Sequence, residues 1–359
     1  MSKKIMLYGA NGYTSRLIIK ELVGQNIKPV LAGRNQEKIN SLADKHGFQF
    51  CIFSLNDSDD IDKNLKEVDI LINAAGPYSL TAKPLIDSCL RTKTHYIDIT
   101  GEIDVFVYAQ SKHEDAKDAG VVVCPGVGFD VIPTDCLSYM LKDKLPDANK
   151  LNICFFSENG RPSIGTAKTS IEGLSKGGRI RKDGKIEPVS LAHAVKEIDY
   201  GQGPKMAMSI PWGDVATAFF STGIPNIIVY IPRSLKGINK IKKQRKWLFI
   251  LKLKFVQNYL KNKMQKKIIN GGDSDEQRAK SKMWVWAEVK NKEGKTESGY
   301  FQVGNGYDVT GYGAMLFAKN IMENTLASLN SVSYTHLRDH ETEADLVCRL
   351  LLEKKKGGG

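Results

Sequence analysis

The stretch LYGANGYTSR at residues 7–16 decides how the first part of the chain folds. It follows the apolar run KIMLY and leads into SRLIIKELVG, whose apolar side chains recur at helical spacing. The glycines therefore lie in a turn between a strand and a helix, where Gly9 can make the tight bend and Gly12 lets the backbone approach a ligand. Because the first N–H groups of a helix have no partner within it, they point at an anion bound in this turn. The pattern predicts a site for the pyrophosphate of a dinucleotide.

Ser15 stands where such turns usually carry a third glycine. A serine fits this position if the helix and the strand lie slightly further apart, and its hydroxyl can then either cap the turn or bond a phosphate. We therefore expect a working phosphate-binding turn. A plain glycine-rich turn that binds nothing is the alternative interpretation.

Short runs rich in β-branched residues alternate with helical stretches over residues 1–126. This alternation is typical of a parallel sheet with crossover helices, and six strands in this order predict an α/β fold with a doubly wound sheet of the Rossmann type. The six expected strands are KIMLYG, KPVLAG, FQFCIFSL, VDILINAAG, HYIDIT and GVVVCPG. Residues 1–126 are thus predicted to form a dinucleotide-binding domain.

The glycine content and the pattern of expected strands change after this domain. Residues 127–305 contain more glycines and isolated strands, which predicts a second, mixed α+β domain for substrate binding or dimerisation. Residues 306–330 have apolar side chains at helical spacing, and we expect them to form a C-terminal helix that closes the fold.

The last residues, 331–359, differ in character from the rest. SYTHLR at 333–338 and LVCRLLL at 346–352 back-translate to adapter sequences of nucleic-acid libraries, and the chain ends in KKKGGG. We interpret this segment as a non-native, adapter-derived tail and exclude it from the fold. A genuine flexible basic tail is the alternative.

The 359 residues are 42% hydrophobic and 8% aromatic, which is ordinary for a globular protein of two domains. No apolar run is long enough to span a bilayer, and we expect no signal peptide, because the first strand begins early. The six cysteines show neither a CxxC pair nor metal-ligand spacing. We expect reduced thiols, no bound metal and a cytoplasmic location.

The net charge of +12 has a local origin. Residues 236–267 contain twelve Lys or Arg and no Asp or Glu, so the rest of the chain is close to neutral and no nucleic-acid partner is expected. Apolar side chains from Trp247 to Leu260 are interspersed with these cations, as in amphipathic helices that lie on anionic membranes. A surface helix packed on the second domain and contact with another acidic partner are the alternatives.

The residues after the second strand indicate which dinucleotide binds. NAD sites usually place Asp or Glu there, because a carboxylate holds the ribose hydroxyls. This chain has AGRN at residues 32–35, with no carboxylate. Arg34 offers a planar cation suited to a 2′-phosphate, and Asn35 adds a hydrogen-bond donor. The sequence therefore favours NADP(H), with a solvated surface arginine as the alternative.

The run NAAGPY at residues 73–78 ends the fourth strand, at the edge where the ligand crevice of such sheets opens. Its glycine and proline let the backbone pass close to a nicotinamide ribose, and Tyr78 can face the ring or the substrate. Hydride transfer also needs a group that gives or takes a proton. Asp98, Glu102 and Asp130 follow later strands and are the candidates, with capping or turn bonding as the alternative role of the two aspartates.

Tyr108 and Lys112 form a Tyr-x-x-x-Lys pair on an expected helix, with Thr100 upstream. Together with NAAG this pattern imitates a short-chain dehydrogenase, in which the tyrosine is the acid and the lysine lowers its pKa. Tyrosine and lysine at this spacing are common on exposed helix faces, and the interval from Thr100 to Tyr108 is short for that arrangement. The pair is a second catalytic hypothesis.

HYIDITGE at residues 95–102, followed by PGVGFDVIPTD at 125–135, resembles the saccharopine dehydrogenase-like oxidoreductase family. GANGYTS, AGRN and NAAGPY fit the same family in the same order. PWGD at 211–214, STGIP at 221–225 and GYDVT at 306–310 resemble its shorter bacterial members. The resemblance implies an NADP(H)-binding Rossmann domain, a second domain at whose junction the substrate lies, and often a homodimer. It does not imply saccharopine as the substrate, since the family also includes trans-acting enoyl reductases.

These patterns together predict an NADP(H)-dependent oxidoreductase that reduces an imine, enoyl or related group of a small molecule. The alternatives are a short-chain-dehydrogenase-like reductase using Tyr108 and Lys112, and a non-catalytic NADPH-binding or membrane-associated protein. The expected cofactor-binding residues are Gly9, Asn11, Gly12, Tyr13, Thr14, Ser15, Arg34, Asn35, Ala75, Gly76, Pro77 and Gly101. The candidate catalytic residues are Tyr78, Asp98, Glu102 and Asp130.

Overall fold

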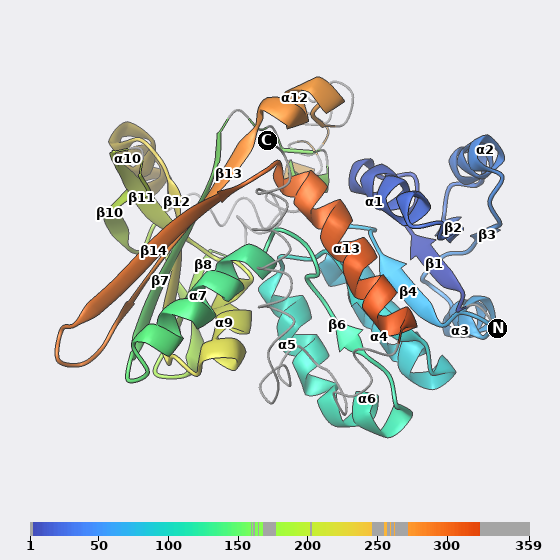
Figure 1. Cartoon of the computed structure of the whole chain (residues 1–359), viewed down its shortest axis with the longest axis horizontal. Helices are drawn as coiled ribbons and strands as arrows, with labels where there is room; N and C mark the ends of the chain where they lie inside the picture. Colours follow the sequence, from blue (N-terminus) through green and yellow to red (C-terminus); the bar gives the residue numbers. More distant parts are fainter. Residues whose placement is uncertain are drawn as a thin grey trace. The chain divides into compact units, whose positions relative to one another are not determined.

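The structure is a computed structural model in which the described residues form two compact units (Figure 1). It describes residues 3–158, 160, 162–163, 165–167, 177–201, 203–245, 255–256, 259, 262 and 272–323. The first unit holds the described residues up to Asp130 and those from Tyr307 onward, and the second holds those of Val131–Gly306. The segments 324–330 and 331–359 and most of 246–267 lie outside the described residues.

The first unit contains a six-stranded sheet in the order β3-β2-β1-β4-β5-β6, with every neighbouring pair parallel. This is the strand order of the doubly wound dinucleotide-binding fold, which confirms the predicted fold class. Its elements are β1 (Ile5–Tyr8), α1 (Tyr13–Gly24), β2 (Val30–Gly33), α2 (Gln36–His46), β3 (Phe50–Ile52), α3 (Ser58–Leu65), β4 (Ile70–Asn73), α4 (Tyr78–Thr92), β5 (His95–Asp98), α5 (Ile103–Ser111), α6 (His113–Ala119), β6 (Val123–Cys124) and α13 (Gly306–Met322).

The central strands of this sheet are buried on both faces. All four residues of β1 and of β4 are buried, which is why their sequences are continuous apolar runs rather than alternating ones. Helix α1 buries Leu17, Ile18 and Leu22 along one stripe, as its spacing predicts. The sheet therefore forms a rigid base from which the loops at the carboxyl ends of the strands project.

Helix α13 belongs to this unit although it is far away in the sequence. At Gly311 an added Cβ would lie 3.2 Å from the backbone of Leu17, so the glycine allows α13 and α1 to approach closely. The ammonium of Lys3 donates to the carbonyl oxygen of Ile321 at 2.7 Å. The helix expected over 306–330 is therefore described as far as Met322, and it packs with the first part of the chain.

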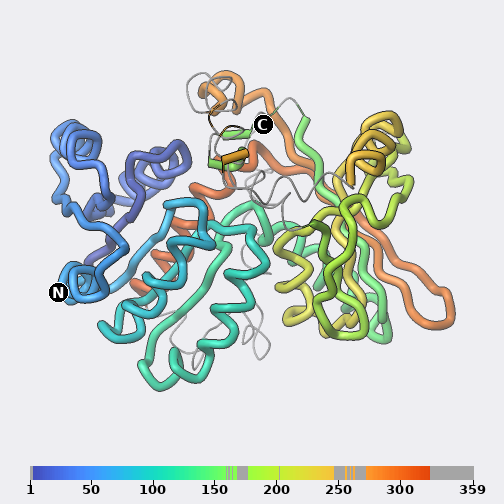
Figure 2. Tube along the Cα trace, turned by 180° about the vertical axis from the view of Figure 1, so that it is seen from behind, coloured from blue at the N-terminus to red at the C-terminus, as the bar shows by residue number. Residues whose placement is uncertain are grey.

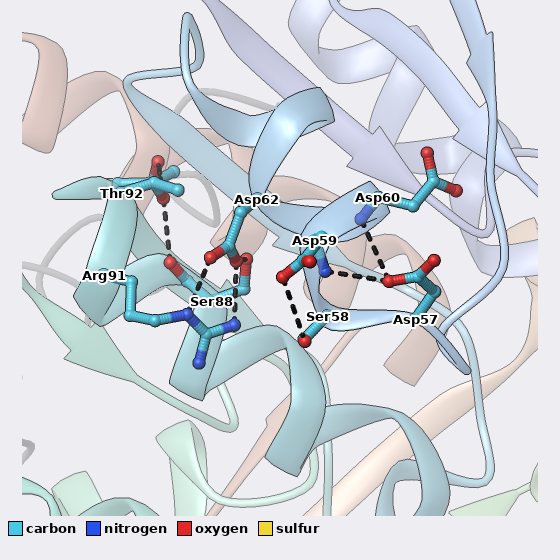
Figure 3. Close-up of polar contacts among 9 residues, drawn as sticks. Asp57, Ser58, Asp59, Asp60, Asp62, Ser88, Arg91 and Thr92 are labelled. Atoms are coloured by element: carbon cyan, nitrogen blue, oxygen red, sulfur yellow. Dashed lines mark hydrogen bonds and ion pairs between the residues drawn. The ribbon is translucent and has the colours of Figure 1, made fainter.

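Polar contacts join the neighbouring helices α3 and α4 (Figure 3). Asp57 caps α3 by accepting from the backbone N–H groups of the first turn. Asp62 accepts from the guanidinium of Arg91 at 2.7 and 2.8 Å and from the hydroxyl of Ser88. Hydrogen bonding from Arg91 lowers the pKa of Asp62, so the carboxylate of this pair stays ionised and holds the two helices together.

The second unit is built on a mixed sheet in the order β10-β11-β12-β7-β13-β14, with β8 and β9 attached at β12. The pair β12–β7 is parallel and the other pairs are antiparallel, in agreement with the predicted mixed α+β domain. Its elements are α7 (Ile132–Lys144), β7 (Lys150–Glu158), β8 (Gly178–Lys182), β9 (Lys185–Val189), β10 (Val195–Asp199), β11 (Pro204–Ile210), α9 (Asp214–Thr222), β12 (Asn226–Pro232), α10 (Leu235–Gln244), α12 (Asp275–Lys280), β13 (Lys282–Lys290) and β14 (Thr296–Val303).

Strands β13 and β14 form the long orange hairpin of this unit (Figure 2). Helix α7 packs on one face of the hairpin, where Leu137 lies 3.5 Å from the position of a Cβ at Gly299. Aromatic rings fill the other face, including Trp284 of β13, whose ring centre lies 6.1 Å from that of Tyr200. The core of the second unit is therefore distinct from that of the first.

Candidate functional site

The turn after β1 is shaped by Gly9, which has a φ of +81°. Its N–H donates to the carbonyl oxygen of Ala32 at 2.8 Å, which draws the turn over the end of β2. A Cβ at Gly9 would lie 2.8 Å from the Cβ of Ala75 in the loop after β4. Only glycine fits, because both the left-handed φ and this close approach exclude a side chain.

Ser15 closes the same turn from inside the first helical turn. Its side chain is fully buried, and its hydroxyl donates to the carbonyl oxygen of Gly9 at 2.8 Å. A Cβ at Gly12 would lie 3.1 Å from the Ser15 oxygen, so the two residues are in close contact. Of the two roles that the sequence left open for Ser15, the structure shows the cap of the turn.

The N-terminus of α1 carries no side-chain cap within the described chain. Its N-cap residue is Gly12, and the first turn contains no acidic residue. By contrast, α2 is capped by Asn35, whose side-chain oxygen accepts from the N–H of Lys38 at 2.9 Å. The positive end of the α1 dipole therefore remains available to an anion, with Tyr13 and Thr14 in its first turn.

Arg34 directly follows Gly33, the last residue of β2, and its side chain is exposed. Burial raises the pKa of Tyr8 to about 12, and the charge of Arg34 acts in the opposite direction, so the guanidinium lies within electrostatic range of the end of β1. The side-chain oxygen of Asn11 lies 3.9 Å from the position of a Cβ at Gly33. Asn11 and Arg34 thus flank the same strand end, with Asn35 engaged at the start of α2.

The loop after β4 is held by Asn73, which is fully buried. The amide nitrogen of Asn73 donates to the hydroxyl of Tyr96 at 3.1 Å and to that of Thr81 at 3.2 Å. Its side-chain oxygen accepts from the N–H of Ala75 at 3.0 Å. This fixes the start of the segment containing Gly76 and Pro77.

Asp98 ends β5 and has no exposed surface. One carboxylate oxygen accepts from the N–H groups of Thr100 at 3.0 Å and Gly126 at 2.8 Å, and the other accepts from the hydroxyl of Tyr96 at 2.7 Å. Burial raises the pKa of Asp98 to about 6 although these hydrogen bonds act in the opposite direction. Because both oxygens are engaged, Asp98 joins the ends of β5 and β6 and is poorly placed to exchange a proton with a ligand.

Glu102 is also fully engaged. Its two carboxylate oxygens accept from the backbone N–H groups of Tyr78 at 2.8 Å and Ser79 at 2.9 Å, which are the first two residues of α4. Pro77, the N-cap of α4, offers no side-chain cap of its own. Glu102 therefore supplies from the end of β5 the acceptors that α4 lacks.

Tyr78 and Asp130 complete the group. Tyr78 is nearly buried, and its pKa is raised well above its usual range by burial and by the charges of Asp98, Asp130 and Glu102. Asp130 is half-buried, and its carboxylate oxygen lies 3.0 Å from the position of a Cβ at Gly101. Burial raises the pKa of Asp130 to about 7. The structure thus brings the four candidate catalytic residues together, and the pKa of Asp130 suits proton exchange near neutral pH.

Thr310 of α13 supports the loop that carries Asp130. The hydroxyl oxygen of Thr310 accepts from the N–H of Phe129 at 3.0 Å, and a Cβ at Gly128 would lie 2.8 Å from the Thr310 methyl group. The sequence did not indicate Thr310 as a site residue, although it is part of the GYDVT run. Nothing local in that run indicates a partner almost two hundred residues away.

The Tyr-x-x-x-Lys pair lies in a different environment. The hydroxyl of Tyr108 donates to Asp87 and accepts from the ammonium of Lys83 at 3.1 Å, while Lys112 binds Asp115 at 2.7 Å. Burial, followed by the hydrogen bond to Asp87, raises the pKa of Tyr108, whereas an acid of this type needs a lowered pKa. The structure shows a tyrosine bound to the middle of α4, and this geometry argues against the second catalytic hypothesis.

Known proteins resemble the first part of this chain. Residues 5–124 match the family model described as the saccharopine dehydrogenase NADP binding domain. The chain is 26% identical over 215 residues to a human saccharopine dehydrogenase-like oxidoreductase, covering 52% of this chain and 50% of that protein. It is 27% identical over 144 residues to a trans-acting enoyl reductase of Mycobacterium ulcerans, covering 37% of this chain and 34% of that protein. The chain thus spans about half the length of the first of these relatives, and less of the second.

A solved structure is similar in fold to this chain. The saccharopine dehydrogenase (L-Glu forming) of Saccharomyces cerevisiae superposes with a TM-score of 0.62 at 15% identity, covering 99% of this chain and 98% of that one. At this identity the likeness concerns the fold alone. In the part of the chain that is described, no helix combines the length and apolar character needed to cross a bilayer.

Proposed function

We propose that the protein is an NADP(H)-dependent oxidoreductase acting on a small molecule. In support, residues 5–124 match the model of an NADP-binding domain. The observation that carries this proposal is the position of Arg34 at the end of β2, beside a helix N-terminus that no side chain of the described chain caps. A cation at this strand end suits a 2′-phosphate, and the uncapped helix suits a pyrophosphate.

The cofactor would lie along the carboxyl edge of the sheet. Gly9, Asn11, Gly12, Tyr13 and Thr14 form the turn and helix start for the pyrophosphate, and Ser15 holds that turn closed. Arg34 and Asn35 would bind the 2′-phosphate, the latter through its amide nitrogen, since its oxygen caps α2. The nicotinamide half would lie against Ala75, Gly76, Pro77 and Gly101. The bound cofactor supplies the hydride.

Asp130 is the residue we propose to exchange the proton that accompanies the hydride. Reduction of an imine, enoyl or carbonyl group consumes a proton, and a donor is most effective when its pKa is near the working pH. The pKa of Asp130 of about 7 meets that condition, and its carboxylate lies close to Gly101, in the segment that follows β5. Tyr78, beside these carboxylates, would contact the ring or the substrate.

The proposal is tested by binding followed by turnover. Calorimetric titration is expected to show tighter binding of NADPH than of NADH. The absorbance of reduced nicotinamide is then followed with imines, enoyl thioesters and carbonyl compounds, and at least one class is expected to be reduced. Stoichiometric binding of NADPH without turnover of any class would favour a non-catalytic NADPH-binding protein. Absence of NADPH binding would contradict the proposal.

Contact with an anionic membrane surface through residues 236–267 is a second proposal, and it rests on exposed groups. The described side chains of Lys236, Lys240, Lys242 and Lys243 on α10 are exposed. Beyond α10, Phe255 is 71% and Tyr259 64% exposed. One relative, 27% identical over 204 residues, is a lipid droplet localized protein of Caenorhabditis elegans. Exposed cations and exposed aromatic rings suit an anionic lipid surface.

Flotation with vesicles containing anionic lipid tests this second proposal. The wild type is expected to float, and a variant with the four lysines of α10 changed to glutamine is expected to float less. Equal flotation of the two proteins, or no flotation of either, would contradict it.

The cytoplasmic location stays a prediction. The homodimer is tested by the mass of the particle in light scattering.

A further inference from the structure

A continuous set of hydrogen bonds runs from β5 to both ends of the loop Ala74–Pro77. At the start of the loop, the side-chain oxygen of Asn73 accepts from the N–H of Ala75 at 3.0 Å, and Asn73 is itself bound to Tyr96. At the end of the loop, Glu102 accepts from the N–H groups of Tyr78 and Ser79 at 2.8 and 2.9 Å. The loop is thus held at its start by Asn73 of β4 and at its end by Glu102, which lies between β5 and α5.

Glu102 is in turn held by the residues at and just after the end of β5. Its N–H donates to the hydroxyl oxygen of Thr100 at 3.0 Å, and the N–H of Thr100 donates to Asp98 at 3.0 Å. Asp98 accepts from Tyr96, which closes the path back to Asn73. All these groups are on rigid elements or in the short segment between β5 and α5, so the carboxylate of Glu102 has little freedom to move.

Both oxygens of Glu102 are required by this arrangement. Each accepts one N–H of the first turn of α4, and the N-cap of that helix is a proline without an acceptor side chain. A charge-assisted pair of hydrogen bonds is directional, and it fixes where the turn of Tyr78 and Ser79 begins. Since the loop Ala74–Pro77 leads directly into this turn, its position depends on the carboxylate.

From this we infer that Glu102 is a positioning residue that sets the loop Ala74–Pro77 for the nicotinamide half of the cofactor. The inference rests on the proposed function, which places that loop beside the nicotinamide ribose. It assigns to Glu102 no contact with the reacting atoms. Glu102 should therefore affect the binding of the nicotinamide half and not that of the adenosine half. The adenosine half would bind at the turns after β1 and β2, which make no hydrogen bond to Glu102 among the described residues.

Glu102→Gln is the informative variant, because it keeps the size of the side chain and one acceptor but removes the charge and the second acceptor. We expect its affinity for NADPH to fall by about tenfold, the effect of weakening charge-assisted hydrogen bonds that order the loop. Its affinity for 2′,5′-ADP, which contains only the adenosine half with its phosphates, should stay within about twofold of the wild type. The matched control is Glu114→Gln on α6, where the carboxylate is largely exposed, and it should bind both ligands like the wild type.

Calorimetric titration of the full chain with NADPH and with 2′,5′-ADP tests whether Glu102 positions the loop. Equal weakening of both ligands in Glu102→Gln would show a general loss of structure, and unchanged NADPH binding would show that the carboxylate does not position the loop. Either result overturns the inference. After either result, the proposed function still holds if the wild type binds both 2′,5′-ADP and NADPH. If the wild type binds neither ligand, both the proposed function and this inference are wrong. Glu102→Asp, one methylene shorter, gives a second variant with the same expected pattern if the glutamine variant folds poorly.

Discussion

The hydroxyl of Ser15 donates a hydrogen bond to the carbonyl oxygen of Gly9 at 2.8 Å, from a side chain with no exposed surface. The residue that departs from the usual glycine pattern therefore stabilises the turn that the first glycine makes. With serine at this position, the N–H groups at the start of α1 are still available to bind a phosphate.

Ser15→Ala is expected to lower the free energy of unfolding by about 1 kcal/mol, because one buried hydrogen bond is lost while the Gly9 carbonyl keeps the N–H of Gly12 at 3.0 Å. Urea denaturation of the two proteins measures the difference. Ser58→Ala, at an exposed serine, is the control and should change little. A stability equal to that of the wild type would argue against a stabilising role for the Ser15 hydroxyl.

Gly9→Ala is expected to be much more damaging than Gly24→Ala at the other end of α1. At Gly9 the φ of +81° and a contact of 2.8 Å with Ala75 both oppose a Cβ, and the φ alone costs about 1–2 kcal/mol. At Gly24 no atom lies within 4 Å of an added Cβ. Thermal unfolding and NADPH titration of both variants check this. Similar losses at the two positions would contradict the description of the turn.

The raised pKa of the Asp130 carboxyl predicts a stability that depends on pH. Its pKa of about 7 in the folded state exceeds the ordinary 3.8, so folding favours the protonated form and stability is lost as pH rises from about 4 through 7. Asp98, with a pKa of about 6, contributes in the same direction. Asp130→Asn removes the larger contribution, so its stability relative to the wild type should rise by roughly 3–4 kcal/mol between pH 4 and 8. A difference between the two proteins that does not change with pH would rule out a raised pKa at Asp130.

Tyr108→Phe is expected to leave NADPH binding and turnover unchanged. Tyr108 is bound to Asp87 and Lys83 on α4, and its removal should cost at most about 1 kcal/mol of stability. Steady-state rates at saturating NADPH provide the measurement, with Asp130→Asn as the variant expected to lose activity. Loss of turnover in Tyr108→Phe would instead support the short-chain-dehydrogenase-like mechanism.

The sequence predicted the features that depend on local pattern. The six parallel strands follow from apolar runs separated by helical stretches, and the turn at Gly9 follows from glycine spacing next to a strand. It could also place Tyr78, Asp98 and Glu102 near one edge, because the carboxyl ends of parallel strands meet there.

The division of roles among these residues was not accessible from the sequence. A glutamate that follows a strand can act on a ligand or cap a neighbouring helix, and only the positions of Tyr78 and Ser79 show that Glu102 does the latter. The support of Asp130 by Thr310 depends on a contact between residues far apart in the chain. Burial, which raises the pKa of Asp130, likewise results from tertiary packing rather than from the adjacent residues.

In the proposed function, Arg34 selects NADP(H) at the end of β2. The most direct measurement is a calorimetric titration of the wild type, Arg34→Gln and the control Lys45→Gln with NADPH and with NADH. Arg34→Gln is expected to lose on the order of 10- to 100-fold in NADPH affinity, since hydrogen bonds between charged groups are worth roughly 1.5–3 kcal/mol, while NADH binding and the control change little. Equal losses for NADPH and NADH in Arg34→Gln, or no preference of the wild type for NADPH, would contradict it.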